Sequence, residues 1–139
     1  MSAVVFVDTN ILIYAHYADA GLKRDRSIEC LRQLWDAGSG RMSEQVLQEF
    51  YINVTRKLAN PVAVATAREV VAIYGEWIRE PTTAATVLRA TQVAEISQIS
   101  FWDALIVASA EQSGATQIYS EDLNVGQTIA SILIVNPLI

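Results

Sequence analysis

Four acidic residues, spread along a chain of 139 residues, have the chemistry of ligands for a divalent cation: Asp8, Glu49, Asp103 and Asp122. Carboxylate oxygens are hard ligands that select Mg²⁺ or Mn²⁺. Metal held by such a cluster activates water and stabilises the leaving oxygen in phosphodiester hydrolysis. If the fold brings the acids together, the sequence predicts a metal-dependent hydrolase that acts on a phosphodiester.

Two of the acids follow segments that have the pattern of buried strands. Asp8 comes directly after the apolar run 3–7, and Asp122 follows the run 116–119. In open α/β sheets, functional sites lie beyond the carboxyl ends of the strands, so both positions suit a site. Both also have a structural interpretation, because Asp8 can cap the next helix and Asp122 can belong to a turn. The spacing alone leaves open whether Asp122 or its neighbour Glu121 points inward.

The other two acids lie in predicted helices. Asp103 is the only charge in the segment 101–110, which is apolar nearly all round and therefore predicts a buried helix. Ser100 and Asp103 also match a capping box. An acid in so apolar a segment is nevertheless expected to be partly desolvated, and a metal ion would supply the missing counter-charge. Glu49 lies at the edge of its helix's apolar stripe, and taken alone it is more often a solvated residue.

The sequence lacks most of the residues that other catalytic mechanisms require. His16 is the only histidine, so a two-histidine ribonuclease mechanism is excluded, and its expected place is a helix surface. Cys30 is the only cysteine; it cannot form a disulfide within the chain, and its apolar surroundings predict a small core residue. No glycine-rich phosphate-binding loop occurs. Neither Lys23 nor Lys57 follows a predicted strand, which argues against a phosphate-accepting receiver domain.

The bulk composition fits one globular domain spanning residues 1–139. Half of the residues are hydrophobic (52%) and 18% are charged. No run approaches the ~20 consecutive apolar residues of a membrane span, so we expect a soluble cytoplasmic protein without a membrane partner. The net charge of −5 is unusual for a protein that binds nucleic acid. If the four candidate ligands are left out of the count, however, the chain has eleven acidic and ten basic residues, so its remaining charge is close to neutral.

Strand-like and helix-like segments alternate along the chain, which predicts an α/β fold with a mostly parallel sheet. The expected strands are 3–7, 41–42, 82–84, 116–119 and 132–135. The expected helices are 11–18, 25–37, 44–58, 61–79, 86–96 and 101–113, several of them with capping residues at their starts.

Four segments together resemble the PIN-domain family, and among its members the VapC-type toxin ribonucleases of bacteria and archaea. The resemblance covers nearly the whole chain and rests on Phe-Val-Asp-Thr-Asn at 6–10, Leu-Gln-Glu-Phe at 47–50, Phe-Trp-Asp-Ala-Leu at 101–105 and Ser-Glu-Asp at 120–122. It implies a three-layer α/β/α domain with a central, mostly parallel sheet. It also implies Mg²⁺ or Mn²⁺ as cofactor, single-stranded RNA as substrate, homodimerisation, and inhibition by a small antitoxin protein.

The family's acids fall on the four candidate ligands, with Asp122 matching in preference to Glu121. By the same resemblance, Thr9, Ser120 and Asn124 would support the ligands from outside, Thr9 and Ser120 by hydrogen bonds, and Glu49 would either bind metal or orient the attacking water. Many relatives carry a further acid where this chain has Asn124, which puts the affinity for a second metal ion in doubt.

The sequence therefore predicts a metal-dependent endoribonuclease that cleaves single-stranded RNA and acts as the toxin of a type II toxin–antitoxin pair. Two alternatives remain open: a catalytically silent PIN-like module that binds proteins, and a structure-specific DNA nuclease. Apolar and aromatic residues in the helices 11–18 and 46–58 further predict a groove between these helices that accepts an amphipathic antitoxin segment.

Overall fold

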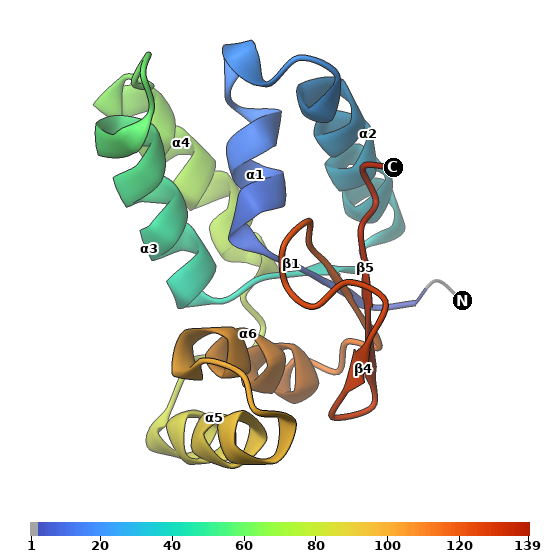
Figure 1. Ribbon diagram of the computed structural model, residues 1–139. Helices are drawn as coiled ribbons and strands as arrows, with labels where there is room; N and C mark the ends of the chain where they lie inside the picture. The colour runs from blue at the N-terminus through green and yellow to red at the C-terminus, as the bar shows by residue number, and fades with distance from the viewer. Residues whose placement is uncertain (1–2) are drawn as a thin grey trace.

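A five-stranded sheet between two layers of helices forms the centre of the computed structural model, which describes residues 3–139 (Figure 1). The strands are β1 (Val5–Val7), β2 (Gly40–Arg41), β3 (Gln117–Tyr119), β4 (Thr128–Ile129) and β5 (Ile132–Val135). The helices are α1 (Thr9–Ala15), α2 (Leu22–Ala37), α3 (Glu44–Ile52), α4 (Val64–Tyr74), α5 (Ala84–Ser97) and α6 (Phe101–Gln112). Short helical turns follow three of these helices, at Ala18–Ala20, Asn53–Lys57 and Gly75–Trp77.

The sheet is mostly parallel, as the sequence predicted. Its strand order is β2-β1-β3-β5-β4, and only β4 runs antiparallel to its neighbour. Figure 1 shows α1 to α4 on one side of the sheet and α5 with α6 on the other, which confirms the three-layer α/β/α arrangement. The register places Val7 of β1 opposite Tyr119 of β3, so these two strands end side by side.

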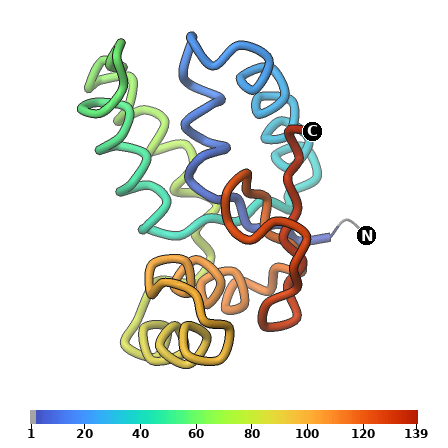
Figure 2. Tube along the Cα trace, viewed as in Figure 1, coloured from blue at the N-terminus to red at the C-terminus, as the bar shows by residue number. Residues whose placement is uncertain are grey.

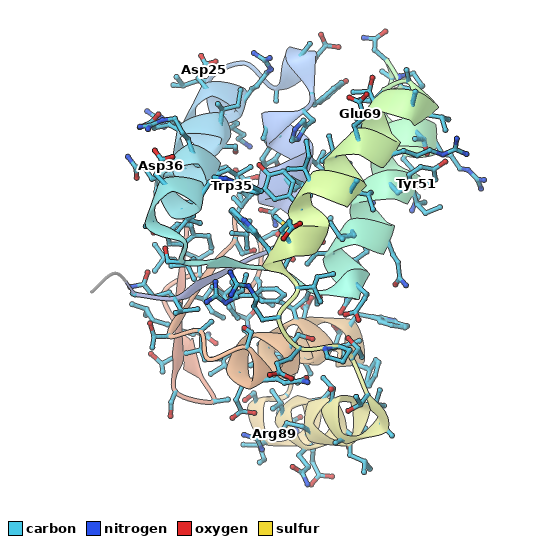
Figure 3. The ribbon with its side chains drawn as sticks, turned by 180° about the vertical axis from the view of Figure 1, so that it is seen from behind. Asp25, Trp35, Asp36, Tyr51, Glu69 and Arg89 are labelled. Carbon is cyan, nitrogen blue, oxygen red and sulfur yellow. The ribbon has the colours of Figure 1, made fainter. Side chains whose placement is uncertain are left out.

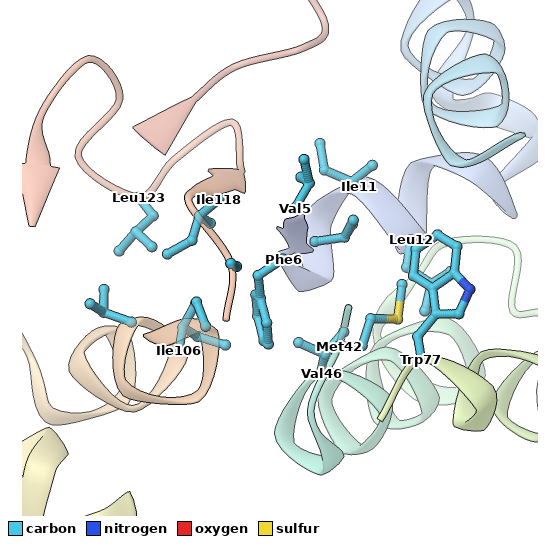
Figure 4. Packing of buried hydrophobic residues seen from close by; sticks show 14 of the residues in the cluster. Val5, Phe6, Ile11, Leu12, Met42, Val46, Trp77, Ile106, Ile118 and Leu123 are labelled. Carbon is cyan, nitrogen blue, oxygen red and sulfur yellow. The ribbon is translucent and has the colours of Figure 1, made fainter. Parts of the chain in front are cut away.

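The core explains why β1 is apolar at every position. All three of its residues are buried, because helices cover both faces of the sheet. Figure 4 shows Phe6 between Ile106 of α6 and Val46 of α3. Burial on both faces fixes the position of the strand, and with it the residue that follows it.

Two short elements differ from the sequence-based expectation. The strand expected at 82–84 is wrong: Thr83 is the N-cap of α5, and its backbone N–H donates to the Thr86 hydroxyl at 3.0 Å. The sequence also gave no sign of β4. The turn from β4 to β5 passes through Ala130 and Ser131, both with positive φ, and neither residue type marks such a turn.

The single histidine and the single cysteine both lie inside the structure. Cys30 is buried, as predicted. His16 is not on an open helix surface; it is half-buried, with its ring edge-on to Phe50 and Tyr74 and its Nδ1 3.0 Å from the Leu12 carbonyl oxygen. The last turn of α1 points this ring toward α3 and α4, so packing decides its environment.

Within residues 3–139, no single helix is long and apolar enough to cross a membrane. Helices α5 and α6 reach that length and apolarity only together, and the pair is bent by 117°.

Gly40 supplies a sharp test of the packing at the sheet edge. A Cβ atom at this position would lie 2.5 Å from ring carbons of the buried Trp77. We expect Gly40→Ala to lower the free energy of unfolding, measured by urea denaturation, by about 1–3 kcal/mol, because the indole has to shift. Gly75→Ala is the matched control, since Gly75 has helical φ and no described atom lies within 4 Å of its Cβ position. Equal stability of the two variants would contradict this packing argument.

Candidate metal-binding site

Asp8 caps a helix and also lines a pocket, so its position is compatible with both interpretations that the sequence left open. Its backbone N–H donates to the Tyr119 carbonyl at 2.9 Å, which extends the pairing of β1 with β3 by one residue. Its Oδ1 accepts from the Thr9 N–H at 2.8 Å and so caps α1. The cap uses one carboxylate oxygen, and Oδ2 faces the loop that follows β3.

Ser120 ties that loop to Asp8. Its side chain is fully buried, and its hydroxyl donates to Asp8 Oδ2 at 2.8 Å. The Ser120 Oγ also accepts from the Leu123 N–H at 3.1 Å, which turns the chain directly after β3. The turn places Asp122 beside Asp8 with its side chain exposed to solvent.

Glu49 reaches the same region from α3. The Thr9 hydroxyl donates to Glu49 Oε1 at 2.8 Å, so the residue after Asp8 holds the helical acid in place. Asn53, at the start of the π-helical turn after α3, donates to the Glu49 carbonyl oxygen at 2.7 Å. Glu49 is half-buried, although its position at the edge of an apolar stripe suggested a solvated residue.

Asp103 lies in the first turn of α6, and its backbone N–H donates to the Ser100 hydroxyl at 3.1 Å. The expectation that Asp103 is partly desolvated is wrong, because the residue is exposed. The reason is local: burial of α6 begins at Ala104, one residue later, and the first turn opens onto a pocket. The helix is buried, as predicted, but its start is not.

All four predicted acids line one pocket of about 420 Å³, together with Thr9, Asn10, Ile13, Asn53 and Leu123. The acids come from four segments that are far apart in the chain. Figure 2 shows these segments meeting where α1, α3 and α6 begin and the loop after β3 passes. Across residues 3–139, however, no three acidic, histidine or cysteine side chains lie close enough together to hold an ion in their present rotamers.

The two neighbouring acids of the loop have different surroundings. Asp122 lines the pocket, whereas Glu121 accepts a hydrogen bond from the Tyr14 hydroxyl at 2.6 Å and pairs with Lys23 at 2.9 Å. The hydrogen bond from Tyr14, and then the one from Lys23, lower the pKa of Glu121. Asn124 adopts a left-handed backbone with φ of 38° and does not line the pocket.

Asn10 is the pocket residue that the sequence analysis missed. Its side-chain nitrogen donates to Asp122 Oδ1 at 2.6 Å, and it lies 3.2 Å from the Ser120 hydroxyl and 3.4 Å from Asp8 Oδ2. The signal was present in the sequence, because Asn10 stands two residues after Asp8, in the first turn of the helix that Asp8 caps. Only the acids and hydroxyls of that segment were considered as functional.

The electrostatics of the pocket favour a cation at Asp8. Burial raises the pKa of this carboxyl to about 6, against the hydrogen bonds from Ser120 and Thr9, which lower it. The nearby charges of Asp122 and Glu49 raise it further. A divalent ion supplies the opposite charge that the ionised Asp8 lacks, and oxygen-only donors suit Mg²⁺ or Mn²⁺. The residue types of the pocket therefore fit such an ion.

Comparisons with known proteins agree with the fold. The family model described as the PIN domain matches residues 5–128. Among solved structures, VapC20 of Mycobacterium tuberculosis, a toxin that cleaves the Sarcin-Ricin loop, is 22% identical with a TM-score of 0.62; the match covers 86% of this chain and 91% of that chain.

Two solved complexes are also similar in structure. FitAB bound to an IR36 DNA fragment is 18% identical with a TM-score of 0.69, covering 97% of this chain and 96% of that chain. VapBC2 from Rickettsia felis, bound to a DNA fragment from its promoter, is 18% identical with a TM-score of 0.60, covering 94% and 96%. No curated protein sequence matches the chain. At these identities the solved structures show a shared fold.

The raised pKa of Asp8 generates a prediction about pH. Without metal, the folded protein holds a proton on Asp8 up to about pH 6, whereas the unfolded chain releases it near 3.8. The contribution of Asp8 to stability is therefore fully present below the unfolded pKa and is lost as the pH rises through 6. At pH 7.5 in EDTA, we expect Asp8→Asn to be more stable than the wild type, by about 3 kcal/mol at most.

The measurement is urea denaturation of both proteins at pH 5 and pH 7.5, and the advantage of Asp8→Asn should shrink at pH 5. The exposed Asp25, remote from the pocket in α2, provides the control variant Asp25→Asn. An advantage that is the same at both pH values would contradict the raised pKa.

Proposed function

The chain belongs to the PIN domain family, and from this premise we propose that it is a metal-dependent endoribonuclease that cleaves single-stranded RNA. The observation that carries the proposal is the convergence of the four predicted acids on one pocket beyond the carboxyl ends of β1 and β3. A catalytically silent scaffold has no need to keep four acids together at an electrostatic cost. The same convergence therefore favours an enzyme over a module that only binds proteins.

Within this proposal, Asp8, Asp103 and Asp122 hold Mg²⁺ or Mn²⁺, and Glu49 is a further ligand or orients the attacking water. The bound ion would activate that water and stabilise the leaving oxygen. The hydroxyl of Thr9 fixes the rotamer of Glu49, and the hydroxyl of Ser120 does the same for Asp8. Such hydrogen bonds orient ligands before the ion arrives.

We also propose that the protein is the cytoplasmic toxin of a type II toxin–antitoxin pair and forms a homodimer. The fold that it shares with VapC20, with FitAB and with VapBC2 supports this assignment. An active ribonuclease also requires control, and a dedicated inhibitor protein supplies it. The antitoxin is accordingly the proposed partner, and RNA the proposed substrate.

The apolar surface available to such a partner differs from the predicted groove between α1 and α3. Phe50 of α3 is fully buried and cannot line a groove. The structure instead has an apolar groove between α3 and α4, of about 550 Å³, lined by Glu44, Leu47, Gln48, Tyr51, Ile52, Arg68 and Val71. Figure 3 shows Tyr51 on one side of α4 and Trp35 of α2 on the other. A groove of this shape suits an amphipathic helix of the antitoxin.

Cleavage assays test the nuclease proposal directly. In Mn²⁺, we expect the wild type to cleave single-stranded RNA, to leave DNA of the same sequence intact, and to stop when EDTA is added. Asp103→Asn should fold normally, because the cap at Ser100 uses the backbone N–H of residue 103, and should lose about 100-fold or more of the cleavage rate. Asp25→Asn should cleave like the wild type. Cleavage of DNA alone would support the DNA nuclease instead, and full activity of Asp103→Asn would contradict the assigned site.

Expression in bacteria tests the toxin proposal. We expect the wild-type protein to arrest growth when it is produced alone, because it would cleave cellular RNA. Asp8→Asn should relieve the arrest at equal protein level, measured as colony counts with an immunoblot for abundance. We also expect a small protein encoded beside this one that relieves the arrest when it is coproduced and that copurifies with this chain. Harmless overproduction of the wild type would contradict the toxin assignment and leave the nuclease assignment to the cleavage assay.

A further inference from the structure

The side chain of Asn10 lies between two of the proposed metal ligands. Its nitrogen donates to Asp122 Oδ1 at 2.6 Å and lies within 3.4 Å of Asp8 Oδ2. Its Oδ1 accepts from the Glu121 N–H at 3.1 Å, in the same loop. The nitrogen and the oxygen of the amide therefore both form hydrogen bonds, and both bond to groups in the loop beside the pocket.

A neutral donor at this position has a clear electrostatic purpose. Asp8 and Asp122 carry like charges, and the Asn10 side-chain nitrogen lies within 3.4 Å of an oxygen of each. No lysine or arginine between residues 3 and 139 forms a salt bridge with either carboxylate. The Asn10 amide directs its N–H groups at both acids, so it offsets part of their repulsion without adding charge.

The amide also restrains the loop that carries Asp122, one of the proposed ligands. Residues 120–127 contain no helix or strand, and Asp122 is exposed, so little packing holds its side chain. Asn10 belongs to the first turn of α1, and it forms hydrogen bonds with the loop at Asp122 and at Glu121. Ser120 accepts from the Asp122 backbone N–H at 3.3 Å but is a weaker restraint on the Asp122 carboxylate, because its Oγ donates to Asp8 Oδ2 at 2.8 Å and lies 3.4 Å from Asp122 Oδ1.

We propose that Asn10 is a positioning residue that holds Asp122 beside Asp8 in the metal-free protein and thereby sets the affinity for the divalent ion. The inference rests on the proposed metal site and goes beyond it, because the amide is not itself a ligand. Its bond to Asp122 Oδ1 leaves Oδ2 of the same carboxylate free for the ion. Groups that orient ligands in this way typically contribute about 10–100-fold to metal affinity.

Two substitutions separate positioning from simple packing. Asn10→Ala removes the donor, and we expect about 10–100-fold weaker Mn²⁺ binding in isothermal titration calorimetry. Asn10→Asp keeps the size and an acceptor for the Glu121 N–H but adds a fifth carboxylate to the pocket. We expect it to have a lower melting temperature than the wild type in EDTA, and a larger rise on addition of Mn²⁺.

Asn60 provides matched controls. Its side-chain nitrogen donates to Asp19 Oδ2 at 2.6 Å, the same bond at the same length, between exposed residues that do not line the pocket. Asn60→Ala and Asn60→Asp should bind Mn²⁺ like the wild type and should show the wild-type rise in melting temperature. They report what the loss of any asparagine–aspartate bond does to the protein.

The outcomes distinguish this inference from the proposed function. Wild-type Mn²⁺ affinity in a folded Asn10→Ala, or a wild-type rise in melting temperature for Asn10→Asp, would overturn the role of Asn10 and leave the ribonuclease proposal standing. A wild-type protein that binds Mn²⁺ but cleaves no RNA would contradict the ribonuclease proposal and leave the role of Asn10 standing. A wild type that binds no Mn²⁺ would contradict both.

Discussion

The parallel pairing of β1 with β3 is the constraint on which the whole site depends. Its register sets Val7 opposite Tyr119, and the next backbone hydrogen bond joins the Asp8 N–H to the Tyr119 carbonyl at 2.9 Å. Asp8 and Ser120 therefore follow adjacent strands at the same level. Strand pairing alone brings their side chains into contact. Because helices bury both faces of β1, packing on each side holds this register.

The pocket brings like charges together, and hydrogen-bond donors make that arrangement tolerable. Asp8 receives N–H or O–H groups from Thr9 and Ser120, and Asp122 receives the amide of Asn10. These donors reduce the repulsion but do not remove it, since burial and the neighbouring acids still raise the pKa of Asp8 to about 6. The folded chain thus stores an unfavourable energy that a bound cation can release, which is a common property of functional sites.

The sequence predicted the parts of this arrangement that depend on local pattern. A continuous apolar run identified β1 and hence the place of Asp8, and the apolar helix after Ser100 identified α6 and Asp103. Patterns could not show what depends on contacts between distant segments. The half-burial of Glu49 accompanies its contact with Thr9 of α1, and Asp103 is exposed because the first turn of α6 opens onto the pocket that these distant segments form. The local pattern places Asn10 close to Asp8, but its bonds to Asp122 and Glu121 join residues more than a hundred positions apart, and local spacing does not encode such contacts.

The two edges of the sheet limit how other chains can join it. Both edge strands, β2 and β4, are only two residues long. At β2 the backbone is also covered, because the Trp77 ring lies against Gly40 and the Trp77 carbonyl accepts from the Met42 N–H at 3.1 Å. Such edges offer few free backbone groups, so strand addition and edge-to-edge aggregation are disfavoured. Any protein that binds this chain therefore meets the side chains of its helices and loops, where recognition depends on shape and charge.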